Sequence, residues 1–171
     1  MIRLLTGSTH TGKTLLAQRL LERHGAPYLS IDHLKMGLIR SGMCPLTPES
    51  TDAALPAVLW PVVREIVKTA VENGQSLTVE GCYIPFNWRE DFDASCLPHI
   101  RLLCLGFSEA YIRTRFDTIQ THANAIERRK DDSFCTMELL LAENRRNLEA
   151  CRRRGLPYYL IDGPYAPPLD W

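Results

Sequence analysis

The feature that most constrains the fold lies near the start of the chain, where consecutive residues match the pattern GxxxxGK[ST]. These residues are Gly7, Ser8, Thr9, His10, Thr11, Gly12, Lys13 and Thr14. An apolar, β-rich run (residues 2–6) precedes them, and an amphipathic helical pattern (residues 13–24) begins at their end. A strand, a glycine-rich loop and a helix in this order are typical of a phosphate-binding loop. The sequence therefore predicts such a loop at the edge of a sheet.

Each residue type in the pattern has a physical role. Glycines let the backbone curl so that its N–H groups point inward at anionic oxygens, and the positive end of the helix dipole adds to that field. Lys13 is predicted to reach the β- and γ-phosphates of a nucleotide, and the Thr14 hydroxyl to ligate Mg²⁺. His10 occupies a variable position and is predicted to be a neutral residue at the rim of the loop. We therefore expect the loop to bind ATP with Mg²⁺.

Strand and helix patterns alternate along the rest of the chain. Short apolar runs predict strands over residues 2–6, 28–31, 76–79, 100–105 and 158–161. Apolar residues at helical spacing predict helices over residues 13–24, 57–73, 108–116 and 136–154. We expect Pro56 and Pro61 to break or kink the start of the second of these helices. The alternation favours an α/β fold with a mainly parallel sheet covered on both faces.

Two carboxylates follow predicted strands at the edge where an open α/β sheet binds ligands. Glu80 ends the third strand and is predicted to hold Mg²⁺ through water; the alternative is a carboxylate in a turn. Asp32 closes the second strand and is predicted to accept the proton of an attacking hydroxyl or to fix the acceptor. It can equally cap the short helix that follows. Arg40, in that helix, and Arg89, after the third strand, are candidates for binding an anionic group on the acceptor.

Residues 117–135 have mixed charge and no firm periodicity. A long irregular segment in a compact domain is more often a functional lid than filler. A closing lid can bring guanidinium groups onto a transferring phosphoryl group. From the arginines in and beside this segment we assign Arg115 and Arg128 to that role.

Composition limits the class of protein. The 171 residues are 45% hydrophobic and 23% charged, which fits a single globular domain. Lys+Arg and Asp+Glu are 20 each, so no net field favours nucleic acid or a membrane as partner. The sequence shows neither a membrane-spanning run nor a secretory signal, and we expect a soluble cytoplasmic protein. The six cysteines lack CxxC spacing, so we expect reduced thiols, mostly buried, and no zinc site.

With these residues in view, the chain resembles the small P-loop kinases of the adenylate-kinase-like group, which includes nucleotide, shikimate and gluconate kinases and antibiotic phosphotransferases. The resemblance rests on GSTHTGKT, Asp32, the VEG around Glu80, the arginine-rich segment and a fifth strand, and it covers nearly the whole chain. It implies a five-stranded parallel sheet of order 2-3-1-4-5, ATP·Mg²⁺ as donor and a mobile lid. It also carries Arg40 over as an acceptor contact.

The sequence departs from adenylate kinases after the third strand, where EGCYIP (residues 80–85) replaces a DGFPR-like stretch. We therefore favour a small-molecule hydroxyl over a phosphate as the acceptor. A nucleoside monophosphate kinase remains an alternative, as do a sugar-nucleotide precursor or a polynucleotide 5′-hydroxyl as acceptor. A non-catalytic nucleotide switch is the alternative from another class. The choice between ATP and GTP, and between monomer and homodimer, stays open.

Overall fold

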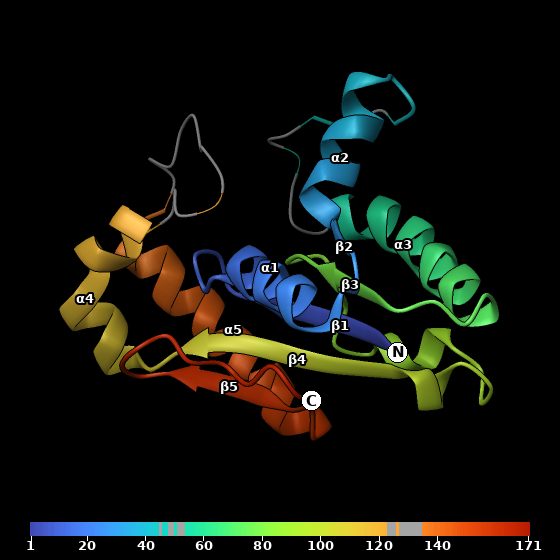
Figure 1. Ribbon diagram of the computed structural model, residues 1–171. Helices are drawn as coiled ribbons and strands as arrows, with labels where there is room; N and C mark the ends of the chain where they lie inside the picture. Colours follow the sequence, from blue (N-terminus) through green and yellow to red (C-terminus); the bar gives the residue numbers. More distant parts are fainter. Residues whose placement is uncertain (45, 48–49, 51–53, 123–125, 127–134) are drawn as a thin grey trace.

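The computed structural model describes residues 1–44, 46–47, 50, 54–122, 126 and 135–171. These residues form a parallel five-stranded sheet in the order β2-β3-β1-β4-β5 (Figure 1). The strands are β1 (Ile2–Gly7), β2 (Tyr28–Ser30), β3 (Leu77–Glu80), β4 (Ile100–Phe107) and β5 (Tyr158–Ile161). All neighbouring pairs run parallel. The predicted fold class and strand order are confirmed.

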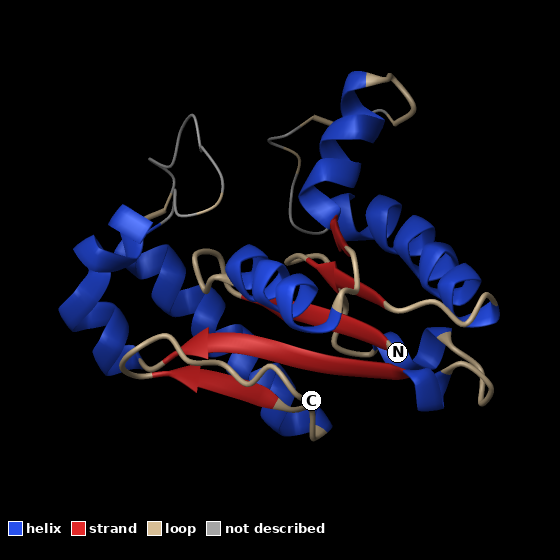
Figure 2. Cartoon of the chain, in the orientation of Figure 1, coloured by secondary structure: helices blue, strands red, loops and turns tan. Residues whose placement is uncertain are grey.

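Helices cover both faces of the sheet (Figure 2). They are α1 (Lys13–His24), α2 (Ile31–Arg40), α3 (Ala54–Glu72), α4 (Glu109–Thr121) and α5 (Met137–Arg154), with two short 3-10 helices, η1 (Trp88–Asp91) and η2 (Leu97–His99). Successive strand residues point to opposite faces. Leu4 accordingly packs in the cluster that contains Val63 of α3 and Cys151 of α5, whereas Leu5 packs against Leu16 of α1. The result is three layers, with these two clusters on opposite faces of the sheet and a third, around Phe107 and Ile112, under α4 and α5.

The expected break in α3 is wrong. The helix begins at Ala54 and continues through both Pro56 and Pro61. Pro56 lies in the first turn, where a backbone N–H has no partner within the helix. Pro61 removes the hydrogen bond to the carbonyl of Ala57, but both residues are exposed, so water can reach that carbonyl. Burial of the apolar stripe on the opposite face, Val63 and Val67 included, holds the helix together.

The expected start of the irregular segment 117–135 is also wrong. Helix α4 continues to Thr121 because Ile119, which is buried, extends the inward face begun by Ile112. Arg115 departs from helical geometry within it, with φ −129° and ψ 22°. Most of the remaining segment, residues 123–125 and 127–134, lies outside the described residues, and the expected lid stays a prediction.

All six cysteines are free thiols, as expected, and Cys96, Cys104, Cys135 and Cys151 are buried. None of the helices within the described part of the chain is long and apolar enough to span a membrane.

Candidate active site

The GxxxxGKT segment forms the loop between the carboxyl end of β1 and the start of α1 (Figure 1). Two of its glycines are required by geometry. Gly7 has φ 136°, and a Cβ there would collide with the carbonyl of Leu105 on β4. Gly12 has φ 74° and is the N-cap residue of α1. The loop therefore lies tightly against the sheet, with the N-terminus of α1 at its end, as an anion-binding loop requires.

Lys13 is enclosed by this loop, with only 8% of its surface exposed. Its Nζ donates to the carbonyl oxygens of Ser8 at 2.8 Å and Gly7 at 3.3 Å. Burial by itself lowers the pKa of Lys13, yet the pKa lies above its ordinary value because three neighbouring groups favour the charged form of the ammonium. In order of effect these groups are Cys82, Glu80 and Asp32. Lys13 is thus a buried cation that the loop encloses.

Thr14 and Glu80 meet beside Lys13. The Thr14 hydroxyl donates to Oε1 of Glu80 at 3.3 Å, and Glu80, the last residue of β3, is 2% exposed. Hydroxyl and carboxylate oxygens are the ligands that Mg²⁺ prefers, and it usually completes its shell with water and substrate phosphates. The described residues hold no group of three or more His, Cys, Asp or Glu that would bind a metal alone. The pair therefore fits a magnesium ion shared with a phosphate.

Asp32 faces the same site from α2. Strand β2 ends at Ser30, so Asp32 lies in the first turn of the helix rather than at the end of the strand. Its side chain is 48% exposed, and its Oδ1 lies 2.8 Å from Nζ of Lys35, one turn further along α2. Because Asp32 also acts on the pKa of Lys13, the carboxylate lies within electrostatic reach of the phosphate loop.

Lys35 and Tyr83 were missed by sequence reasoning. Lys35 is 15% exposed, and its Nζ donates to the Tyr83 hydroxyl at 3.1 Å and lies 5.4 Å from the centre of that ring. Burial lowers the pKa of Lys35, but the contacts with Asp32 and Tyr83 together outweigh it and the pKa is raised. Burial raises the pKa of Tyr83, so its hydroxyl stays protonated at neutral pH. The spacing from Asp32 to Lys35 was readable in the sequence, but nothing there joined Lys35 to Tyr83.

Cys82 interacts electrostatically with both Lys13 of the phosphate loop and Asp32 of α2. The charges of Lys13, Asp32 and Glu143 act on its thiol. Desolvation by the surrounding atoms is the largest influence on the pKa of Cys82 and raises it, so the thiol is neutral at neutral pH. Groups from the phosphate loop, α2, the segment after β3 and α5 therefore interact with one another around Lys13.

Helix α5 also contacts the phosphate loop. Glu143 Oε2 accepts a hydrogen bond from the Thr9 N–H at 3.3 Å, and Asn147 Nδ2 donates to Ser8 Oγ at 3.1 Å. His10 Nδ1 lies 2.9 Å from Thr9 Oγ1 and 3.5 Å from Cys135 Sγ. More than 130 residues separate Thr9 from Glu143, and no sequence pattern linked them.

Two of the four arginines assigned from sequence lie away from the loop. Arg89 is in η1, whose residue Trp88 packs in one cluster with Ile2 and Ile100, the first residues of β1 and β4. This places η1 at the amino edge of the parallel sheet, opposite the phosphate loop, and there the guanidinium of Arg89 lies 5.4 Å from the centre of the Trp88 ring. Arg40 is the exposed last residue of α2, roughly 12 Å along the helix from Asp32.

Arg115 is exposed on α4, where it lines a cavity of about 480 Å³ together with Thr118 and residues 162–164 after β5. It thus lies on a cavity wall near the carboxyl ends of β4 and β5. Arg128 lies outside the described residues.

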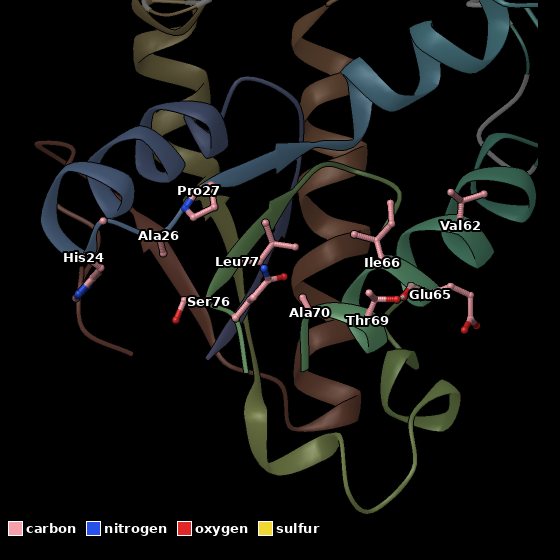
Figure 3. Close-up of a pocket in the computed structure, with 12 residues that line it drawn as sticks. His24, Ala26, Pro27, Val62, Glu65, Ile66, Thr69, Ala70, Ser76 and Leu77 are labelled. Carbon is pink, nitrogen blue, oxygen red and sulfur yellow. Dashed lines mark hydrogen bonds between the residues drawn. The ribbon is translucent and has the colours of Figure 1, made fainter. Parts of the chain in front are cut away.

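A cavity of about 820 Å³ lies elsewhere (Figure 3). Pro27, which precedes β2, and Leu77, which begins β3, line one side, and Val62 and Ile66 of α3 line the other (Figure 3). It therefore lies at the amino edge of the sheet, and its lining includes no residue of the phosphate loop.

Three solved structures similar to this chain are kinases. A gluconokinase from Sinorhizobium meliloti is 18% identical over 98% of this chain and 83% of its own, with a TM-score of 0.52. A sugar kinase from Janibacter is 18% identical over 94% and 84%, with a TM-score of 0.52. The deoxyadenosine kinase of M. mycoides is 11% identical over 95% and 90%, with a TM-score of 0.56.

No protein-family model matches the chain, and no curated protein matches it. Identities this low show similarity of fold alone. The strand order of the sheet and the position of the Lys13 loop between β1 and α1 agree with that fold. The chain has the α/β fold of the small P-loop kinases.

Proposed function

We propose that this protein is an ATP-dependent phosphotransferase that moves the γ-phosphoryl group to a hydroxyl group of a small molecule. One observation carries the proposal: a half-exposed carboxylate, Asp32, lies within electrostatic reach of the enclosed ammonium of Lys13. Phosphoryl transfer needs cations around the phosphates and a group that orients the nucleophile, and the enzyme contributes mainly positioning and charge. The site around Lys13 offers both kinds of group.

The phosphate half of the site consists of the loop and its neighbours. On nucleotide binding, Lys13 would exchange its bonds to the Ser8 and Gly7 carbonyls for phosphate oxygens. Thr14 and Glu80 would hold Mg²⁺, which supplies positive charge to the β- and γ-phosphates when bound. The fixed donors of the loop stabilise the charge that spreads over the phosphoryl oxygens during transfer.

The cavity of about 480 Å³ is suited to the base of the nucleotide. Residues 162–164 form one wall, and the next residue, Tyr165, donates a hydrogen bond to the Gly12 carbonyl of the phosphate loop at 2.6 Å. A nucleotide with its phosphates in the loop can therefore extend toward this cavity. In this arrangement Arg115 is a base-side contact on α4 rather than a partner of the transferring phosphoryl group.

The acceptor half favours a hydroxyl over a phosphate. A phosphate acceptor would place its own negative charge beside the Asp32 carboxylate, which is unfavourable, whereas a hydroxyl can donate its proton to that carboxylate. Lys35 holds one oxygen of Asp32, and Asp32 is open enough for its other oxygen to meet an acceptor. In this proposal Asp32 orients the attacking hydroxyl and accepts its proton, and Lys35 keeps the carboxylate in place.

The first test is thermal unfolding of the purified protein with ATP·Mg²⁺, followed by addition of hydroxylated metabolites, nucleosides, antibiotics and nucleoside monophosphates. A ligand at 100 times its dissociation constant stabilises the folded state by about 2.7 kcal/mol, and we expect Tm to rise by several degrees. Compounds that add a further shift are then assayed for ADP formation. Transfer to a hydroxyl supports the proposal, transfer only to monophosphates assigns the alternative acceptor, and a flat response to ATP contradicts nucleotide binding.

Glu143→Gln is expected to strengthen ATP·Mg²⁺ binding by roughly three- to tenfold, because the carboxylate of Glu143 occupies a loop N–H and repels the incoming triphosphate. The dissociation constant is measured by isothermal titration calorimetry. Glu149→Gln, an exposed residue on the same helix, makes the same charge change away from the loop and is expected to leave affinity unaltered. Weaker binding by Glu143→Gln would instead assign Glu143 to the magnesium or phosphate site.

A further inference from the structure

The segment after β5, residues 162–171, lies beside α1 and the phosphate loop. The ring nitrogen Nε2 of His24, at the end of α1, lies 2.8 Å from the carbonyl oxygen of Leu169, and Trp171 packs on the apolar cluster of Leu16 and Leu20. In Figure 1 this segment, in red, returns from the end of β5 along the sheet. At its start, Tyr165 is the residue that reaches the phosphate loop itself.

Tyr165 is held closely against Gly12. The guanidinium of Arg19 lies 5.2 Å from the centre of the Tyr165 ring, and its Nη1 donates to the Tyr165 carbonyl at 3.5 Å. A Cβ on Gly12 would lie 2.8 Å from the tyrosine hydroxyl, so the ring leaves no room for any other residue type there. Burial raises the pKa of Tyr165, so the hydroxyl remains a donor at neutral and alkaline pH.

The hydroxyl fixes one peptide unit of the loop. The Gly12 carbonyl accepts two hydrogen bonds, from Tyr165 Oη at 2.6 Å and from the Leu16 N–H at 2.9 Å. Because a peptide unit is planar and trans, the N–H of Lys13 points opposite to this carbonyl. Anchoring the carbonyl outside the loop therefore directs the Lys13 N–H into it. A carbonyl that accepts strong hydrogen bonds also polarises its own N–H and makes it a better donor.

We propose that Tyr165 is a positioning residue for phosphate binding, which it supports by orienting and polarising the Gly12–Lys13 peptide. The inference rests on the proposed binding of a nucleotide in this loop and adds a residue that the GxxxxGKT pattern does not contain. Tyr165 acts through the backbone of the loop and needs no contact with the nucleotide. Its effect is therefore the same for any ligand that places phosphates there, with or without a base.

The test compares wild type with Tyr165→Phe, which keeps the ring and removes only the hydroxyl. Dissociation constants for ATP·Mg²⁺ and for inorganic tripolyphosphate with Mg²⁺ are measured by calorimetry well below the unfolding temperature. Loss of one hydrogen bond to the loop is expected to weaken both ligands by the same factor, roughly five- to tenfold. Tyr159→Phe is the matched control, since Tyr159 is a partly buried neighbour on β5 that packs in the same cluster. It is expected to leave both affinities unchanged.

The outcomes separate this inference from the proposed function. If wild type binds both ligands and Tyr165→Phe binds them equally well, the inference is wrong and the proposed function stands. If only ATP binding weakens, Tyr165 acts on the base cavity and the inference is again wrong. If Tm falls in Tyr165→Phe but both affinities persist, its role is structural and the inference is overturned. If wild type binds neither ligand, both proposals fail together.

Discussion

Lys13→Ala is expected to lower ATP-dependent transfer by at least about 10²–10³-fold, the scale seen when one donor to a developing oxyanion is removed. The reason lies in the enclosure of the ammonium. Lys13 is 8% exposed, and its Nζ donates to two loop carbonyls, of Ser8 and Gly7, which phosphate oxygens would replace. No other cation among the described residues is bonded to this loop in the same way, so none takes over its charge. Phosphoryl transfer by the purified variant is measured as ADP formation.

The same variant tests whether the loop binds phosphate at all. We expect the rise in Tm caused by ATP·Mg²⁺ to disappear, while the circular dichroism spectrum of the variant stays that of a folded α/β protein. Lys68→Ala on α3 is the matched control, because Lys68 pairs with Glu65 on the protein surface, away from the phosphate loop. If Lys13→Ala kept both the ATP-induced shift and the transfer rate, assignment of the loop to ATP would be untenable.

Much of the fold followed from the sequence because its signals are local. The strand order was implied by the resemblance, and the alternation of strands and helices agreed with it. The apolar stripe of α3 could be recognised in the sequence. The prediction of a break at Pro61 was wrong because it considered only the low helix propensity of proline and not the burial of Val63 and Val67 on the opposite face. The extension of α4 to Thr121 was missed for a related reason, since one buried residue, Ile119, continues the inward face through polar neighbours.

The site was predictable only where its residues are neighbours in sequence or end a strand. Lys13, Thr14 and Glu80 lie as the motif and the strand pattern indicated. Tyr83, Glu143 and Tyr165 reach the site through contacts across the fold, and no spacing rule encodes such contacts. Arginines were the least predictable, because a long exposed side chain has no signature of its direction. Arg89 contacts Trp88 and Arg115 lines the cavity beside α4. The sequence could not show that these side chains point there rather than at the phosphate loop.

Asp32→Asn is expected to leave ATP·Mg²⁺ affinity near the wild-type value and to lower transfer to a hydroxyl acceptor by about two orders of magnitude or more, the scale of losing a general base. The amide keeps the shape of the side chain but cannot accept the proton of the nucleophile. Affinity is measured by calorimetry and transfer by ADP formation with the acceptor found in the thermal screen. Asp93→Asn, in the exposed turn before η2, makes the same change away from Lys13 and Asp32 and serves as control.

A second variant, at Lys35, tests the role of Asp32 further. If Lys35 only positions the Asp32 carboxylate, its effect on transfer depends on that carboxylate being present. Lys35→Met is then expected to lower transfer in the wild-type background and to cause little further loss when Asp32 is already Asn, a non-additivity that a double-mutant cycle measures. Additive losses would mean that Lys35 contacts the acceptor or the phosphoryl group itself. Full transfer by Asp32→Asn would mean that the carboxylate has no part in the reaction, and the case for a hydroxyl acceptor, which depends on its charge, would fall with it.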